Sequence, residues 1–193
     1  YIEPIKSADL KSLCDELKES SAMPQEYFDR FEVKRGLRNR DGSGVMAGLT
    51  KVCSVEGYYI EDGERRPIEG KLKYRGIDIN QIVDACVAEN RFGFEEIAHL
   101  LLFGELPDAK ELATFKQILG DFRSLPTHFV RDIIMKAPSK DMMNALARSV
   151  LTMYAYDDRA DDTSIENVVR QSLQLISLFP LISVYAYHAY NHY

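Results

Sequence analysis

Cysteine is scarce in this 193-residue sequence, and the spacing of the few present excludes the usual cysteine-based sites. The three cysteines are Cys14, Cys53 and Cys86, and no two of them form a CxxC pair. A zinc knuckle or a thioredoxin-type redox centre needs such a pair, so neither is expected. We predict instead buried structural thiols in a protein of a reducing compartment, the cytoplasm.

An excess of basic residues is also missing. Lys and Arg total 24, Asp and Glu total 30, and the formal net charge is −6. A general nucleic-acid binder carries a basic excess, so nucleic acid is not an expected partner. Hydrophobic residues make up 46% and charged residues 28% of the chain, which is typical of a folded soluble protein and excludes a disordered one.

Charge of either sign is absent from the last segment, between Gln171 and Tyr193. The run reaches the roughly 20 residues that a membrane-spanning helix needs. Glutamines, serines, histidines and Pro180 interrupt it, however, and such polar groups are costly in hydrocarbon. We therefore expect no membrane span, but a helix buried within the protein or between two copies of it. Because the sequence stops inside this apolar run, we also expect it to be part of a longer protein.

Residues 1–17 mix charges throughout, unlike a signal peptide.

Three segments are expected along the chain. Residues 1–40 read as a polar arm with one short helix, capped by Ser7. Residues 41–76 read as a small β-hairpin or meander, because β-type residues flank the turn dipeptide Asp62-Gly63. Residues 77–193 read as helical almost throughout. The breaks expected in the returning strand are Pro67 and Gly70.

Single residues mark where the helices of the third segment are expected to begin and end. Asp78 is expected to cap the first helix, and Gly104 to follow the second in a left-handed conformation. Pro107 is expected in the first turn of the third helix. A fourth helix is expected over 127–137, ending before Pro138.

The last two expected helices cover residues 141–156 and about 164–190. Alanines among the apolar residues of the first predict close approach to another helix. Thr163 and Glu166 form a capping-box pattern at the start of the second, and Pro180 is expected to kink it. The predicted class is mainly α, part of a larger all-α domain with a small β segment.

Two motifs with possible ligand chemistry are better explained without a ligand. Residues 42–47 match G-x-G-x-x-A, but a dinucleotide site needs a strand before the motif and a helix after it. A basic stretch precedes this motif and a strand-like run follows, so a turn is expected. The segment 30–40 is rich in Arg and Lys, which suit phosphate oxygens, although short charge runs are more often a solvated face.

The four histidines form no catalytic pattern. His99 reads as a helix residue at the edge of the core, and His128 has no evident partner. His188 and His192 are four residues apart and would share a helix face able to hold a metal, yet the sequence indicates no third ligand. No Ser-His-Asp or Cys-His arrangement can be assembled, and G-x-S-x-G is absent. We therefore assign no catalytic, substrate-binding or metal-binding residue.

Three stretches in order nevertheless resemble one enzyme family. Residues 70–79, with the run Tyr74-Arg75-Gly76, resemble the turn that ends the small β segment of citrate synthases. Residues 100–107, Leu-Leu-Leu-Phe-Gly-Glu-Leu-Pro, resemble a run between two helices of that family, and residues 48–50 with the hairpin resemble its opening. Many members have His-Pro-Met before the helix at Met142, where this chain has Ala137-Pro138-Ser139-Lys140-Asp141.

The resemblance implies a mostly helical enzyme that condenses acetyl-CoA with oxaloacetate and hydrolyses the citryl-CoA formed, in the tricarboxylic acid cycle. An aspartate and two histidines perform the acid–base steps in that family. All three would lie beyond Tyr193, so we expect an N-terminal portion of the large domain that is inactive alone. The family's basic coenzyme A phosphate contact corresponds to Gly44 here, and Arg38 or Arg40 are the expected substitutes.

By the same resemblance, helices 141–156 and 164–190 correspond to those packed across a homodimer interface. No cofactor is expected beyond acetyl-CoA, which is a substrate. Two alternatives remain open: a 2-methylcitrate synthase, which takes propionyl-CoA, and a non-catalytic helical dimerisation module.

Overall fold

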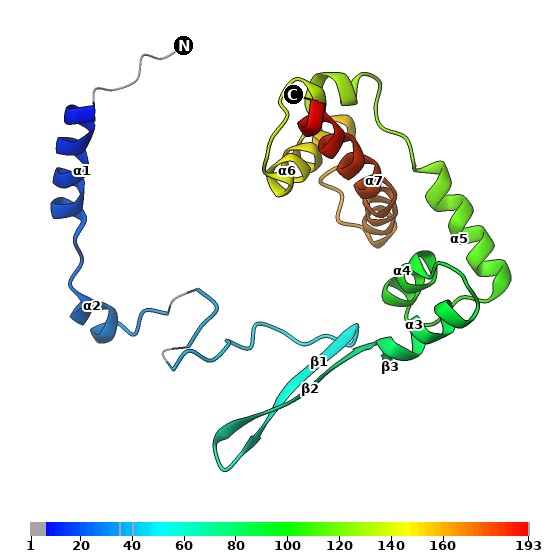
Figure 1. The fold of residues 1–193 in the computed structure, drawn as a ribbon, viewed down its shortest axis with the longest axis horizontal. Helices are drawn as coiled ribbons and strands as arrows, with labels where there is room; N and C mark the ends of the chain where they lie inside the picture. Colours follow the sequence, from blue (N-terminus) through cyan, green and yellow to red (C-terminus); the bar gives the residue numbers. More distant parts are fainter. Residues whose placement is uncertain (1–6, 35, 40, 193) are drawn as a thin grey trace. The chain divides into compact units, whose positions relative to one another are not determined.

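The computed structural model describes residues 7–34, 36–39 and 41–192 (Figure 1). The chain divides into two compact units, Tyr1–Thr50 and Lys51–Tyr193, and each is described by itself. Arg40 and the side chain of Ser7 lie outside the described part, so the roles expected for them stay predictions.

The first unit contains two helices, α1 (Ser7–Ser21) and α2 (Gln25–Arg30), so the expectation of a single short helix is wrong. Pro24 occupies the N-cap position of α2, where its missing N–H costs no helical hydrogen bond. Among the described residues of this unit no side chain is buried. The unit therefore gains little stability from an apolar core of its own.

The second unit opens with a three-stranded antiparallel sheet in the order β1-β2-β3. β1 (Cys53–Glu61) and β2 (Glu64–Tyr74) are joined at Asp62-Gly63, the dipeptide that predicted a hairpin, and β3 (Ile77–Asp78) adds a short edge. Asp62 and Gly63 both have positive φ, 52° and 79°, as a tight two-residue hairpin turn requires.

β2 continues through Pro67 and Gly70, so the expectation that these residues break the strand is wrong. The sheet absorbs them as an irregularity in pairing, because the register shifts between Glu56 and Tyr58 on the partner strand. The sheet also corrects the expectation of an all-α domain, although the described chain is mainly helical.

Three helices follow, and their first and last residues show which local sequence signals set the helix ends. Asp78 caps the first helix by accepting a backbone hydrogen bond from Asn80, and Gly104 follows the second at φ 99°, both as predicted. Asp108 caps the third and forms a capping box with Glu111, so Pro107 lies before the helix and not in its first turn. The three helices are α3 (Ile79–Ala88), α4 (Phe94–Phe103) and α5 (Ala109–Asp121).

The next segment departs from the predicted α-helix over 127–137. It forms only a six-residue π-helix, η1 (Val130–Met135). His128 has a φ of +67°, which prevents regular helix from starting at Thr127, and Pro138 limits its extension at the other end. Phe129, between His128 and η1, is completely buried.

The final helices match the predicted positions, with one cap displaced. Asp141 caps α6 by accepting a hydrogen bond from the Asn144 N–H. At the start of α7 the Ser164 hydroxyl accepts from the Asn167 N–H, so the cap is Ser164 and the predicted Thr163–Glu166 box is wrong by one residue. The helix continues past Pro180. The elements are α6 (Met142–Met153), η2 (Tyr154–Tyr156) and α7 (Ile165–His192).

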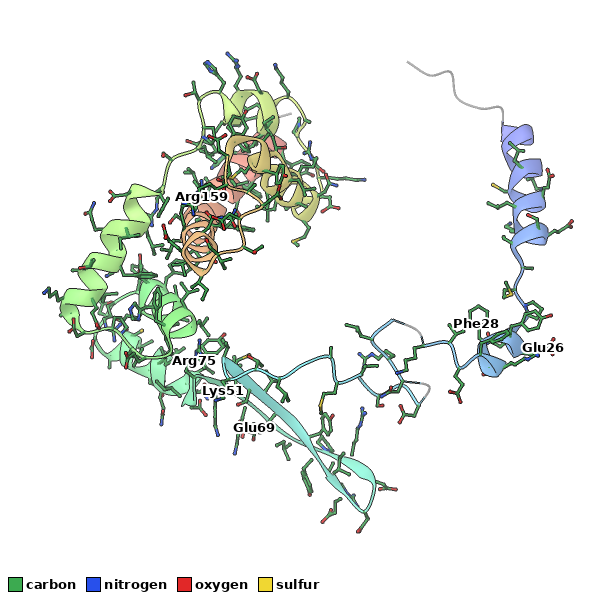
Figure 2. All side chains as sticks on the ribbon, turned by 180° about the vertical axis from the view of Figure 1, so that it is seen from behind. Glu26, Phe28, Lys51, Glu69, Arg75 and Arg159 are labelled. Carbon is green, nitrogen blue, oxygen red and sulfur yellow. The ribbon has the colours of Figure 1, made fainter. Side chains whose placement is uncertain are left out.

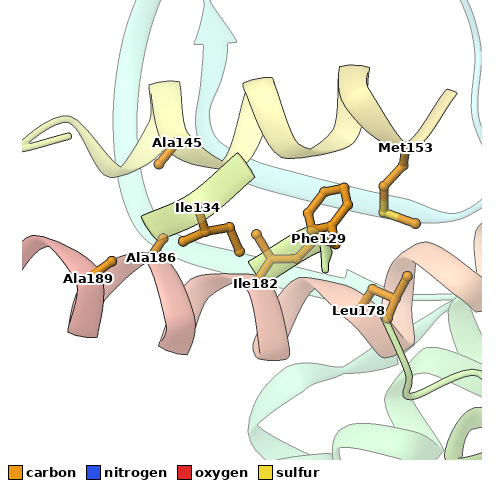
Figure 3. Close-up of a cluster of buried hydrophobic side chains, with 8 residues drawn as sticks. All are labelled: Phe129, Ile134, Ala145, Met153, Leu178, Ile182, Ala186 and Ala189. Atoms are coloured by element: carbon orange, nitrogen blue, oxygen red, sulfur yellow. The ribbon is translucent and has the colours of Figure 1, made fainter. Parts of the chain in front are cut away.

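Two clusters of buried side chains join the helices from α5 onward. The larger one lies between α6, α7 and η1 (Figure 3). The smaller one joins α5 to the first half of α7 through Phe115, Leu119 and Leu173. The larger cluster consists of Phe129, Ile134, Ala145, Met153, Leu178, Ile182, Ala186 and Ala189.

The cysteines do not form the buried set that their scarcity predicted. Cys14 and Cys53 are exposed and Cys86 is partly buried, and all three are free thiols. The expectation of buried structural thiols is therefore wrong.

Candidate functional site

The α6–α7 pair carries apolar side chains both in a buried contact and on its exposed sides. Inside, Leu178 and Ile182 of α7 are completely buried against Phe129 and α6 (Figure 3). Ala145 and Ala186 contribute small side chains to the same contact, and small residues let two helix backbones approach closely. The alanine-rich pattern of α6 is therefore used for packing within the chain.

Two buried hydroxyls in this pair carry no penalty for burial. Ser149 of α6 donates to the Ala145 carbonyl, and Ser177 of α7 donates to the Leu173 carbonyl, both at 2.8 Å. Buried polar groups with satisfied hydrogen bonds do not oppose close packing. The contact between α6 and α7 is thus a complete core, not a polar groove.

Apolar side chains also cover the sides of α6 and α7 that face away from this core. Leu151 of α6 is 76% exposed, and Val184 and Tyr187 of α7 are 55% and 56% exposed. No Asp, Glu, Lys or Arg occurs between Gln171 and His192 to make this surface polar. Exposed apolar side chains that gather into one patch mark interaction sites, and these residues are candidates for such a site. We call these residues the outer surface of α6–α7: Met143, Leu151, Phe179, Val184 and Tyr187.

A polar network fixes the connection between η2 and α7. The Arg170 guanidinium donates to both carboxylate oxygens of Asp157, at 2.8 and 2.7 Å, and its Nε donates to Asn167 Oδ1 at 2.8 Å. Asn167 is completely buried, and its amide donates to the carbonyls of Arg159 and Asp162 at 2.8 Å each. Figure 2 marks Arg159 within this connection.

The network also explains the electrostatics at the start of α7. Hydrogen bonds from Arg170, then from Gln171 and the Arg159 N–H, lower the pKa of Asp157. Hydrogen bonding from Arg159, then from Ser164, lowers the pKa of Asp162 to about 2. Both carboxylates are therefore ionised at neutral pH, and they serve to hold the turn. Neither is poised to move a proton.

α7 is long and apolar enough to cross a membrane by length and composition, with a mean hydropathy of 1.3 over its most apolar window. Its buried stripe packs on α6 and η1, and its exposed residues include His188, Asn191 and His192. The packing and the polar residues together favour a helix that belongs to the protein core.

The four histidines lie in three separate places. His99 contacts the Phe103 and Phe115 rings, and its Nδ1 lies 3.1 Å from the Glu105 carbonyl oxygen, so it is a packed residue at the core edge. His128 is exposed in a turn. His188 and His192 are both exposed near the end of α7. Within residues 7–34, 36–39 and 41–192, no three His, Cys, Asp or Glu side chains gather to hold a metal ion.

The G-x-G-x-x-A segment closes a turn in the first unit. Arg38 and Gly44 form an isolated antiparallel bridge, and the Asn39 N–H donates to the Ser43 carbonyl at 2.8 Å. The next element along the chain is β1, so no helix opens on the motif as a dinucleotide site requires. Arg38 and Lys34 line a nearby cavity of about 470 Å³.

Sequence reasoning missed a contact that joins the sheet to the helices. Arg75, in the turn between β2 and β3, donates from Nη2 to the Leu101 carbonyl at 2.7 Å (Figure 2). Its positive charge thus lies at the negative end of the α4 dipole. Gly76 beside it has a φ of 88°, which the tight turn requires. The Tyr74-Arg75-Gly76 run is therefore structural.

A cavity of about 550 Å³ between α3 and α4 was also missed. Its lining is mainly apolar, with Cys86, Asn90 and Arg91 as the polar exceptions. Arg91 forms ion pairs with Glu89 and Glu96, both at 2.5 Å, so its charge is already compensated.

Comparison with known proteins identifies the family. The family model described as citrate synthase, C-terminal domain, matches residues 36–193. A citrate synthase of Corynebacterium glutamicum is 31% identical over 84% of this chain and 37% of its own length. The 2-methylcitrate synthase 2 of the same organism is 27% identical over 78% of this chain and 34% of its own length.

The fold agrees with a solved structure. A citrate synthase from Thermoplasma acidophilum, in a ternary complex with carboxymethyl coenzyme A and oxaloacetate, superimposes with a TM-score of 0.61. It is 19% identical, and the match covers 76% of this chain and 34% of that one. The chain thus spans about a third of the length of the relatives that it matches. With the family model covering most of its residues, the chain belongs to the citrate synthase family.

Proposed function

We propose that this chain forms the N-terminal portion of the large domain of a citrate synthase, which condenses acetyl-CoA with oxaloacetate to give citrate and coenzyme A in the tricarboxylic acid cycle. The observation that carries the proposal is the family match over residues 36–193, together with the outer surface of α6–α7. The neighbouring Thermoplasma structure holds carboxymethyl coenzyme A and oxaloacetate, which supports the same substrates here.

The role of this portion is scaffold and homodimer interface. The outer surface of α6–α7 is apolar and uncharged, and obligate dimer interfaces resemble a hydrophobic core divided in two. The network around Asn167 supports this role, because it fixes the start of α7 before a partner binds. A rigid surface loses less conformational entropy on association.

The chain alone is inactive in this account, because we assign none of its residues to the acid–base steps. The test is release of coenzyme A from acetyl-CoA and oxaloacetate, followed with a thiol reagent, with an intact citrate synthase as positive control. We expect no release above the rate without protein. Turnover that depends on both substrates would show that catalytic groups are present here.

A second candidate is 2-methylcitrate synthase activity, with propionyl-CoA as the acyl donor. It is favoured by the names of several relatives, including 2-methylcitrate synthases of Corynebacterium glutamicum and Shewanella oneidensis at 25–30% identity. The two activities are separated by kcat/KM for acetyl-CoA and propionyl-CoA, measured on the enzyme that contains this chain. A preference for propionyl-CoA would replace the first proposal.

The remaining alternative is a non-catalytic helical dimerisation module. The length of the reading frame distinguishes it, because about 200 further residues with two histidine motifs would exclude a module. For either form we propose a cytoplasmic protein without nucleic-acid or membrane partners. For the citrate synthase we propose no cofactor beyond acetyl-CoA, which is a substrate.

A further inference from the structure

The histidines near the end of α7 share a helix face. α7 is continuous from Ile165 to His192, so His188 and His192 lie one helical turn apart. Residues four apart on a helix have Cβ atoms roughly 5–6 Å from each other, and their side chains lean the same way. Two imidazoles at this spacing are able to reach one metal ion together.

Both rings project away from the core. The core side of this part of α7 is formed by Ile182, Ala186 and Ala189, which are buried between α6 and η1. His188 and His192 are exposed, on a different side of the helix from that stripe. They are therefore accessible to an ion in solution without any change in packing.

The pair also differs from the other histidines in its contacts. His99 is held between two phenylalanine rings and the Glu105 carbonyl. In the described part of the chain, the His188 ring contacts the Tyr187 ring, and the imidazoles of His188 and His192 form no hydrogen bond or ion pair. The imidazole nitrogens of the pair are therefore available as ligands.

The surroundings select the kind of ion. No carboxylate occurs between Gln171 and His192, and no third His, Cys, Asp or Glu joins the pair among the described residues. Hard cations such as Mg²⁺ and Ca²⁺ need oxygen ligands, which this face does not supply as carboxylates. Imidazole suits Cu²⁺, Ni²⁺ and Zn²⁺, with affinity following the Irving–Williams order. Water fills the remaining coordination positions.

We propose that His188 and His192 form a two-ligand site for a divalent transition-metal ion on the exposed side of α7. The site binds Cu²⁺ most tightly, then Ni²⁺ and Zn²⁺, and leaves Mg²⁺ unbound. Because histidine must be neutral to ligate a metal, acid weakens binding. The proposal does not depend on the enzymatic function, since it needs only the folded α7 and access to the His188–His192 face beside the outer surface of α6–α7.

The test is titration of the full chain with CuSO₄, and separately with NiCl₂, followed by calorimetry and by the visible absorption of bound Cu²⁺. We expect one site per chain with an imidazole-type Cu²⁺ spectrum. His188→Ala and His192→Ala should each weaken binding roughly tenfold or more, about 1.4 kcal/mol per factor of ten, whereas His128→Asn should not.

A composition-matched control separates the pair from histidine content. Exchanging two residues of α7, by Tyr190→His combined with His192→Tyr, keeps every residue type but places the histidines two positions apart. Such residues do not face each other on a helix, so binding should fall as in the single variants. Circular dichroism checks that α7 remains folded. Unchanged Cu²⁺ affinity in the exchanged variant, or no difference between His192→Ala and His128→Asn, would overturn the proposal.

Discussion

Arg170 holds both carboxylate oxygens of Asp157 with a single guanidinium nitrogen, at 2.8 and 2.7 Å, across thirteen residues of sequence. The same guanidinium donates through Nε to Asn167, which binds two carbonyls of the intervening turn. Arg170 of α7 thus links Asp157, at the end of η2, to the side-chain amide of Asn167, which binds the turn between η2 and α7. The direction in which α7 leaves this connection depends on that link.

Replacing Arg170 by methionine should lower the urea midpoint of unfolding more than the Arg131→Met control does. The change leaves the mostly buried Asp157 carboxylate without its cation and Asn167 without one donor. Arg131→Met is the matched control, because Arg131 pairs with Asp132 while remaining 62% exposed. That variant should change the free energy of unfolding by less than about 0.5 kcal/mol. Equal shifts in the two variants would mean that the network does not fix the turn.

Acid should destabilise the wild type more steeply than an Asp162→Asn variant. In the folded protein the pKa of Asp162 is lowered to about 2. A carboxyl with a lowered pKa stabilises the folded state above its ordinary pKa, about 3.9, and loses that contribution as the pH falls through the lowered value. Thermal melts at pH 5, 4, 3 and 2 should therefore converge for the two proteins at the acidic end. Parallel curves across this range would contradict the assignment.

Truncating the core residue Ile182 to alanine should cost about 2–5 kcal/mol, because the side chain is completely buried between α7, α6 and η1. Val184→Ala removes apolar atoms two residues along the same helix, but from a side chain that is 55% exposed. That control should cost less than about 0.5 kcal/mol in the monomer. Chemical denaturation of both variants at low protein concentration measures the difference.

Removing the cap of α5 by Asp108→Ala should cost about 1 kcal/mol. The Asp108 carboxylate accepts from the N–H groups of Lys110 and Glu111, both at 2.8 Å, and the Asp108 N–H donates to the Glu111 carboxylate. Asp108→Asn should restore most of the loss, and Lys116→Ala on the same helix should have little effect. Failure of asparagine to rescue would indicate a role other than capping.

The caps and turns show how far local sequence predicts this fold. Asp78, Gly104 and Asp62-Gly63 act within their own turns, so the sequence identifies them directly. The start of α7 was misplaced by one residue because Thr163 and Ser164 are both good caps. The choice depends on the Asp162 carboxylate, which accepts from the Ser164 N–H at 2.9 Å, and on buried Asn167.

The π-helix and the candidate site show why the rest needs the structure. Apolar spacing over 127–137 does not distinguish a π-turn from an α-helix, and the left-handed His128 has no sequence signal. The uncharged run between Gln171 and Tyr193 did predict a long apolar helix. It did not reveal Asp157 as the partner of Arg170, or Leu101 as that of Arg75, because both contacts join residues far apart in sequence.

Self-association through the outer surface of α6–α7 is the central claim, and sedimentation equilibrium of the full chain tests it most directly. At concentrations on the order of tens of micromolar the chain should be a dimer. Val184→Glu places a charge on that surface and should give a monomer with unchanged helix content, while Ala113→Glu on α5 should remain dimeric. A wild-type chain that sediments as a monomer at these concentrations would contradict the account.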